Sequence, residues 1–176
     1  MKKKLSNKII ELVKGDIASQ SDCDTVVNAA NARLRMGGGV AGAIHTKAGP
    51  DLERECEPLA PISPGEAVIT SGHELPNDHV IHCLGPIYGK DKPEDELLAK
   101  CYRNALRLAD ENDVGSVAFP AISTGAFGYP VDAAAEVALN TVVRELDKLK
   151  NVRRVRFVLH SDGDLKVHEK ILESLL

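Results

Sequence analysis

Two kinds of hydrophobic pattern alternate along this chain. Short runs of β-branched and other apolar residues, typical of buried strands, are separated by longer stretches whose apolar residues recur every three or four positions, as in amphipathic helices. We predict strands at 9–13, 25–30, 67–70, 80–84, 116–120 and 152–160. We predict helices at 40–47, 51–59, 94–110, 132–149 and 164–176, with Asp132 as the N-cap of the fourth.

This alternation predicts an α/β layered fold with a mostly parallel sheet, because parallel strands need a helical crossover between them. A length of 176 residues fits a single domain over 1–176, and a hydrophobic content of 43% is enough for a real core. The chain has no internal repeat, low-complexity segment or long linker. In such sheets, ligands bind at the carboxyl ends of the strands. Polar residues that directly follow the predicted strands are therefore the candidate site residues.

The segment 25–49 organises this candidate site. It passes from a strand through a polar turn with Asn28 and Asn31 to three consecutive glycines, 37–39, and then into a helix. Glycines let a ligand approach the backbone, and the first N–H groups of a helix have no partner and favour negative charge. Alternatively, the glycines make only a tight turn and the asparagines are turn residues. Three glycines between a strand and a helix favour an anion site.

A second glycine loop follows the strand at 116–120. Its backbone N–H groups and two hydroxyls could form a concave phosphate nest, and two such loops at one sheet edge suit a diphosphate. Phe127 could pack on a sugar face, although Phe127 and Tyr129 could equally be core residues. The loop consists of Ser123, Thr124, Gly125, Ala126, Phe127, Gly128 and Tyr129.

Two further candidates also follow strands. Asp16 comes after Gly15 at the end of the first predicted strand, where its carboxylate could accept a hydrogen bond from an exocyclic amine such as that of adenine. The alternative is a turn or N-cap aspartate. His160 ends the last predicted strand. The convergence of these positions on one sheet edge indicates a site more strongly than any single motif.

Composition argues against several other functions. The net charge of −4 disfavours a broad basic surface for duplex DNA, and an aromatic content of 3% disfavours a stacking platform for single strands. The basic start lacks the apolar segment of a signal peptide, and no apolar run has transmembrane length. We therefore expect a cytoplasmic protein that does not engage membranes.

The cysteines and histidines do not form a metal-ligand pattern. Cys23, Cys56, Cys83 and Cys101 show no CxxC spacing and are expected to be reduced core residues. His79 and His82 lie three apart on a predicted strand and so point to opposite faces. We expect His45 to be a packing or capping residue, and we expect no metal and no cofactor.

Gly37, Gly39 and Gly42 match the dinucleotide pattern G-x-G-x-x-G, but a lone match is weak. That fingerprint requires its first glycine directly after a strand, whereas residues 31–36 intervene here. We therefore rank the interpretation as an NAD-dependent oxidoreductase well below that of a different kind of phosphate-binding site. The chain has no P-loop motif and no G-x-S-x-G.

Taken together, these motifs resemble the signature blocks of macrodomains in order and spacing over almost the whole chain. The matching blocks are Gly15-Asp16-Ile17, Val27-Asn28-Ala29-Ala30-Asn31, Gly37-Gly38-Gly39-Val40 and Ser123-Thr124-Gly125-Ala126-Phe127-Gly128-Tyr129-Pro130. Two other blocks, 64–67 and 82–86, look most like the bacterial MacroD-type branch, which is related to ADP-ribose 1''-phosphate processing proteins. The resemblance implies a three-layer α/β/α fold with a mixed, mostly parallel central sheet. It also implies a monomer that takes ADP-ribose, ADP-ribosylated protein or O-acetyl-ADP-ribose.

The resemblance also implies roles for individual residues. Asp16 would hold the adenine amine, the Ile17 N–H would lie near the ring, and His160 would stack beside it. Asn31 would hydrogen-bond the distal ribose and Phe127 would pack on it, with Asn31, Gly39 and Phe127 forming the catalytic set. The expected ligand contacts are Asp16, Ile17, Asn28, Asn31, Gly37, Gly38, Gly39, Val40, Ala41, Ser123, Thr124, Gly125, Ala126, Phe127, Gly128 and His160.

One departure from the family pattern bears on activity. MacroD-type hydrolases usually carry an aspartate, proposed to help activate water, where this chain has Ala41. Some viral and archaeal macrodomains with alanine there are also credited with hydrolysis, so Ala41 removes the most obvious general base without excluding turnover. Two hypotheses remain: a hydrolase acting on ADP-ribosyl esters of proteins or on O-acetyl-ADP-ribose, which we favour, and a module that only binds ADP-ribose.

Overall fold

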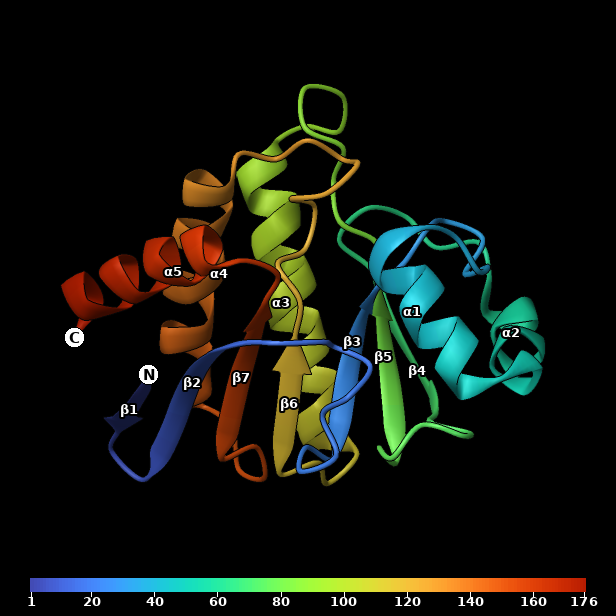
Figure 1. Ribbon diagram of the computed structural model, residues 1–176, viewed down its shortest axis with the longest axis horizontal. Helices are drawn as coiled ribbons and strands as arrows, with labels where there is room; N and C mark the ends of the chain where they lie inside the picture. The colour runs from blue at the N-terminus through green and yellow to red at the C-terminus, as the bar shows by residue number, and fades with distance from the viewer.

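The computed structural model describes residues 1–176 and contains a seven-stranded sheet in the order β1-β2-β7-β6-β3-β5-β4 (Figure 1). The strands are β1 Lys2–Leu5, β2 Lys8–Lys14, β3 Thr25–Ala29, β4 Ala67–Ser71, β5 His79–Cys83, β6 Ser116–Phe119 and β7 Arg154–Leu159. The helices are α1 Gly39–Ala48, α2 Pro50–Cys56, the short 3₁₀ helix η1 Glu57–Leu59, α3 Glu94–Glu111, α4 Val131–Leu146 and α5 Asp162–Leu175.

The sheet is mixed, with a parallel centre and antiparallel edges. The five central strands β2, β7, β6, β3 and β5 pair in parallel, while β1 and β4 pair antiparallel to their neighbours. Parallel strands bring their carboxyl ends to one edge of the sheet, the upper edge in Figure 1. The predicted sheet type is confirmed, and the loops after these strands lie along that edge.

Helices cover both faces of the sheet and give it three layers (Figure 1). Helices α3, α4 and α5 pack on one face, where 26 buried residues form what we call the back cluster, including Phe119, Phe157 and Tyr102. Helices α1 and α2 pack on the other face over β3, β5 and β4. There, 16 buried residues form the front cluster, which includes Ile17 and Cys23 of the loop after β2.

Helix α3 begins at the predicted residue and the other four α-helices begin one or two residues earlier, with a different capping residue than expected in α4. The N-cap of α4 is Pro130, and Asp132 lies inside the first turn, so its prediction as N-cap was wrong. Its carboxylate still lies near the positive end of the helix dipole. Helix α5 begins at Asp162, because the Ser161 hydroxyl accepts the Asp164 N–H at 3.1 Å and caps the helix two residues earlier than predicted.

Strand β1 was not predicted, because it carries no apolar alternation beyond Leu5. Its three lysines, Lys2 to Lys4, are typical of an edge strand that is protected from pairing with other chains. None of the helices combines the length and apolar character needed to cross a lipid bilayer.

Candidate functional site

The turn after β2 places Asp16 next to the end of β7. Lys14 pairs with Leu159, and the Gly15 N–H donates to the Leu159 carbonyl at 3.1 Å. Asp16 and His160 therefore leave two neighbouring strands at the same level, and both are exposed. The structure brings together the two residues expected beside the base.

The carboxylate of Asp16 shapes its own turn and leaves one oxygen largely free. Its Oδ1 accepts the Ala18 N–H at 2.9 Å, whereas Oδ2 has only a long contact of 3.4 Å to the Ser19 hydroxyl. The next side chain, Ile17, is buried in the front cluster and anchors the turn. Asp16 is thus a turn residue, as the alternative interpretation held, with an exposed oxygen that can still accept a ligand hydrogen bond.

The glycine stretch forms the N-terminus of α1. Gly38 is its N-cap, with extended backbone angles, and no side chain caps the helix. Gly39 has a φ of +57°, and a Cβ built on Gly38 or Gly39 would meet no atom within 4 Å. The backbone is therefore approachable where the unpaired N–H groups and the helix dipole attract an anion.

Asn31 holds the loop between β3 and these glycines. Its Oδ1 accepts the Arg35 N–H at 3.0 Å, and its Nδ2 donates to the Arg35 carbonyl at 2.7 Å. A Cβ built on Gly37 would lie 3.3 Å from Asn31 Nδ2, and one on Gly42 would lie 2.5 Å from the Gly37 carbonyl oxygen. The half-buried Asn31 carboxamide therefore lies beside the start of the glycine stretch.

The second glycine loop is closed by its own backbone. Ser123 has a φ of +69° and Gly128 a φ of +74°, and the Tyr129 N–H donates to the Ser123 carbonyl at 2.9 Å. A Cβ on Gly125 or Gly128 would meet open space. The Ser123 hydroxyl is buried and has no hydrogen-bond partner. This loop has the curved, open backbone expected of an anion nest.

Of the remaining residues of this loop, one stabilises it through a hydrogen bond and two are wholly or partly exposed. The Thr124 hydroxyl donates to the Ala121 carbonyl at 2.7 Å, so it supports the loop. Ala126 is exposed. Phe127 is half-buried and packs against the front cluster, which leaves part of its ring at the surface.

The loop after β5 supports this second glycine loop, which sequence reasoning did not foresee. A Cβ on Gly85 would overlap Ser123 Oγ, so only glycine fits beneath Ser123. The Tyr88 N–H donates to the Phe127 carbonyl at 2.9 Å, and the half-exposed Tyr88 ring lies 4.8 Å from that of Tyr129. The signal available in the sequence was a glycine two residues after a parallel strand that ends at the same edge.

Comparison with known proteins assigns the family. The sequence profile of the Macro domain family matches residues 27–138, more than half of the chain. The chain is a macrodomain. A Macro domain-containing protein of Chlorobaculum tepidum is 48% identical over 167 residues, covering 94% of this chain and 96% of that protein.

The solved structures of other macrodomains agree. The Oceanobacillus iheyensis macrodomain with ADP superposes with a TM-score of 0.95 at 41% identity, covering 99% of this chain and 95% of that one. The Trypanosoma brucei macrodomain in complex with ADP-ribose gives a TM-score of 0.85 at 38% identity, covering 92% and 68%. The ADP-ribose glycohydrolase MACROD2 of Xenopus laevis is 46% identical over 166 residues, which span 93% of this chain and 40% of that protein.

In this macrodomain, Asn28 lies in the interior and not at the exposed edge. Its Nδ2 donates to His82 Nδ1 at 3.1 Å, so the proton of His82 resides on Nε2, which donates to the Thr70 hydroxyl at 2.9 Å. Burial lowers the pKa of His82 to about 3 and keeps the ring neutral. The structure thus gives Asn28 a structural partner beneath the loop that carries Asn31.

Val40 and Ala41 follow the glycines in the first turn of α1. Val40 is half-buried and packs on the front cluster, while Ala41 is 5% exposed and belongs to neither hydrophobic cluster. Position 41 is therefore buried in the first turn of α1, just behind the helix N-terminus.

The four cysteines of the macrodomain are free and buried, as expected. Burial raises the thiol pKa of Cys56 to about 11 and that of Cys101 to about 12, so neither forms a thiolate at neutral pH. His45 is buried with both ring nitrogens unpaired, so it packs and does not cap a helix. No group of three potential metal-ligating side chains is present.

The dinucleotide fingerprint does not have its required context. Strand β3 ends at Ala29, and the loop containing Asn31 separates it from Gly37. The glycine stretch therefore belongs to the macrodomain loop described above.

Proposed function

We propose that this macrodomain binds ADP-ribose along the edge formed by the carboxyl ends of its parallel strands. The observation that carries this proposal is the convergence there of an exposed carboxylate oxygen at Asp16, the uncapped glycine N-terminus of α1 and the curved loop 123–128. Related macrodomains described as complexes with ADP and with ADP-ribose support the same ligand.

Each part of this edge suits one part of the ligand. Asp16 accepts the adenine amine, the Ile17 N–H lies near the ring, and His160 stacks beside the base. The diphosphate lies between the glycines 37–39 and the loop 123–128, where backbone N–H groups supply its hydrogen bonds. The distal ribose lies at Asn31 and Phe127.

We further propose that the protein hydrolyses ADP-ribosyl esters, either on acidic residues of proteins or in O-acetyl-ADP-ribose. Water is consumed, the ester bond breaks, and ADP-ribose and the free carboxylic acid are released. The 46% identity to a protein named as an ADP-ribose glycohydrolase supports this activity. Asn31 positions the distal ribose, and the substrate's own diphosphate assists the attacking water, since Ala41 provides no base.

The second candidate is a binding module without turnover. It is favoured by one observation, the alanine at position 41, whose side chain can neither accept nor donate a proton. Binding and turnover must therefore be measured on the same preparation.

Titration calorimetry with ADP-ribose tests the binding proposal, and release of ADP-ribose from glutamate-linked protein under single-turnover conditions tests hydrolysis. We expect saturable binding and measurable release that Asn31→Ala removes. Asn31→Ala also loses both bonds to Arg35, so its melting temperature is measured beside its rate as the check on folding. Binding without release would leave the module that only binds and refute the hydrolase for that substrate.

Ala41→Asp separates the two candidates further. In a slow hydrolase, a carboxylate at this position should raise the single-turnover rate, with a smaller effect on ADP-ribose affinity. Ala41→Asn has nearly the same size without the charge and should leave the rate unchanged. If Ala41→Asp loses affinity for ADP-ribose and Ala41→Asn does not, the new charge repels the diphosphate.

A further inference from the structure

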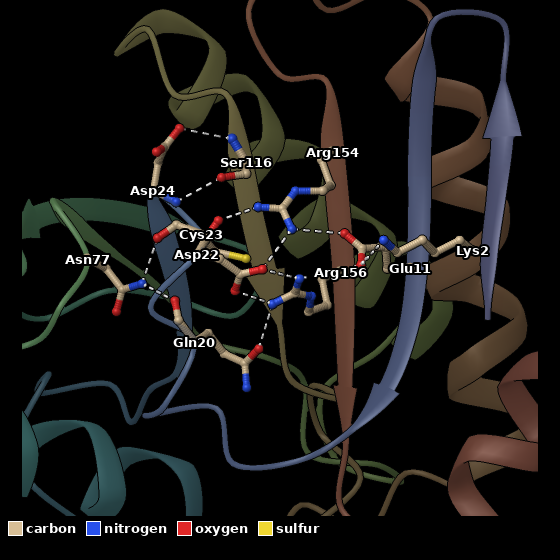
Figure 2. A network of polar contacts seen from close by, with 10 residues as sticks. All are labelled: Lys2, Glu11, Gln20, Asp22, Cys23, Asp24, Asn77, Ser116, Arg154 and Arg156. Atoms are coloured by element: carbon tan, nitrogen blue, oxygen red, sulfur yellow. Dashed lines mark hydrogen bonds and ion pairs between the residues drawn. The ribbon is translucent and has the colours of Figure 1, made fainter.

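The loop of residues 15–24, which carries the proposed adenine contact, is fastened to the sheet by a polar network in which Glu11 and Arg156 are buried and Asp22 is exposed (Figure 2). The loop leaves β2, crosses β7 and β6 on the face that also carries α1 and α2, and enters β3 (Figure 1). Its first residues include Asp16 and Ile17. How the loop is held therefore decides where the Asp16 carboxylate lies.

Arg156 on β7 is the centre of this network. Its guanidinium binds Asp22 through two contacts of 2.7 Å, and its Nη2 lies 3.4 Å from Glu11 on β2. Arg154 binds the same two carboxylates, with Nη1 at 3.0 Å from Glu11 and 3.2 Å from Asp22. The Arg156 side chain is only 10% exposed, so its position is fixed by these paired charges.

Gln20 connects this fixed guanidinium to the turn with Asp16. Its Oε1 accepts a hydrogen bond from Arg156 Nη1 at 2.9 Å, and its Nε2 donates to the Asp16 carbonyl at 2.8 Å. Gln20 is buried, so these bonds have little competition from water. A continuous chain of hydrogen bonds therefore runs from a strand of the sheet to the backbone of Asp16.

A second buried carboxamide, Asn77, also holds this loop, and it does not contact Asp16. Asn77 Nδ2 donates to the backbone carbonyls of Gln20 and Cys23 at 2.8 and 2.7 Å, in the second half of the segment. Both Gln20 and Asn77 are thus buried carboxamides that hold the same loop, and only Gln20 contacts the residue proposed to read the base. This difference provides a matched control.

We propose that Gln20, held by Arg156, is a positioning residue that sets the selectivity of this protein for adenine. The proposal rests on the proposed binding of ADP-ribose. The Asp16 carboxylate has one oxygen committed to its turn, so a shift of the Asp16 carbonyl rotates the other oxygen away from the adenine amine. Selectivity for the base is then lost, while the diphosphate and ribose contacts on the other loops remain.

The measurement is the ratio of dissociation constants for the hypoxanthine analogue of ADP-ribose and for ADP-ribose itself, by titration calorimetry. Hypoxanthine replaces the donor amine with a carbonyl, so the wild type should prefer ADP-ribose by about tenfold, the value of one charged hydrogen bond. Gln20→Ala should reduce this ratio to about twofold or less, mainly by weakening ADP-ribose binding. Asn77→Ala should lower the melting temperature and leave the ratio as in the wild type.

A second variant separates positioning from stability. Gln20→Glu keeps an acceptor for Arg156 and replaces the donor to the Asp16 carbonyl with a carboxylate oxygen that repels it, so it should stay folded and lose selectivity. An unchanged ratio in both Gln20 variants overturns the proposal, and so does an equal loss of ratio in Asn77→Ala, since any loosening of the loop would then suffice. A wild type that does not bind ADP-ribose refutes the proposed function itself, and this outcome is distinguished by the first titration.

Discussion

At the scale of single residues, the site depends on which atoms are already used inside the fold. Asp16 illustrates this, because Oδ1 stabilises its turn and Oδ2 is nearly free. Asn28 illustrates the opposite case, since its carboxamide contacts His82 in the interior. Asparagine and aspartate at strand ends therefore serve both structure and binding, and only the pattern of partners separates the two.

Asp16→Ala should weaken ADP-ribose binding by roughly tenfold or more, because a hydrogen bond to a charged group contributes about 1.5–3 kcal/mol. Asp16→Asn is the control for the fold, since it keeps an acceptor for the Ala18 N–H; it should bind with intermediate affinity. Titration calorimetry of the three proteins gives the comparison. Wild-type affinity in Asp16→Ala would mean that Asp16 serves the turn alone.

The buried ring of His82 should make stability depend on pH. Its pKa is about 3 in the folded state and 6.5 in the unfolded chain, so acid protonates the unfolded state first. Stability should be complete above about pH 6.5 and fall as the pH decreases toward 3, by about 2 kcal/mol between pH 7 and 5. Burial also lowers the pKa of His45 and of His168, so these two residues add to the loss of stability as the pH falls.

Urea unfolding at pH 7 and at pH 5 measures this effect. His82→Gln should be less stable than the wild type at pH 7 and should show a smaller difference between the two pH values. Equal pH dependence in both proteins would show that His82 does not titrate as its burial requires.

At the scale of elements, the glycine stretch is the clearest case in which the backbone itself forms the site. Gly39→Val should abolish ADP-ribose binding and any hydrolysis. A β-branched side chain at a φ of +57° is strained, and it would occupy the space beside the first N–H groups of α1. Calorimetry and the single-turnover assay measure the two losses.

Gly38→Ala is the matched control for strain. Its φ is −84° and its Cβ would meet open space, so it should keep the melting temperature of the wild type. Any loss of affinity in Gly38→Ala then reports on close approach of the ligand alone. Full binding by Gly39→Val would contradict an anion site at this helix.

Elements with a strong hydrophobic period were predictable from the sequence, and elements defined by polar contacts were not. The sequence identified β3, α3 and the loops at the ends of parallel strands, because burial imposes their patterns. Strand β1 lacked such a pattern, because three of its four residues are lysines. The cap at Ser161 was also missed, since a single hydroxyl decides it.

The same distinction applies to the candidate site. Asp16, the glycines and the loop 123–128 could be placed on one edge because topology alone brings strand ends together. The residues that support the site could not be predicted, because Gln20 and Arg156 are far apart in the chain and meet only through tertiary packing. Gly85 is similar, since its requirement for glycine comes from Ser123 on another strand's loop.

At the scale of the molecule, the proposed ligand would bridge four loops that lie apart in the sequence. Asp16, Asn31, Ser123 and His160 follow β2, β3, β6 and β7, which occupy adjacent places in the sheet. A ligand that binds only the folded state adds RT ln(1 + [L]/Kd), or about 2.7 kcal/mol at roughly a hundred times Kd. For a chain of this size, that corresponds to a rise in melting temperature of roughly 5–10 °C.

Hydrogen exchange shows where this stabilisation acts. Among amides that exchange by local opening, ADP-ribose should slow those at 15–19, 36–42, 123–129 and 160–162, because one ligand suppresses the separate opening of four loops. AMP should protect mainly 15–19 and 160–162, since it lacks the distal ribose and one phosphate. Ribose 5-phosphate should protect mainly 36–42 and 123–129. Slowing confined to one loop, or equal slowing along the whole of α3 and α4, would contradict a ligand that spans this edge, because these helices pack along the opposite face of the sheet from α1.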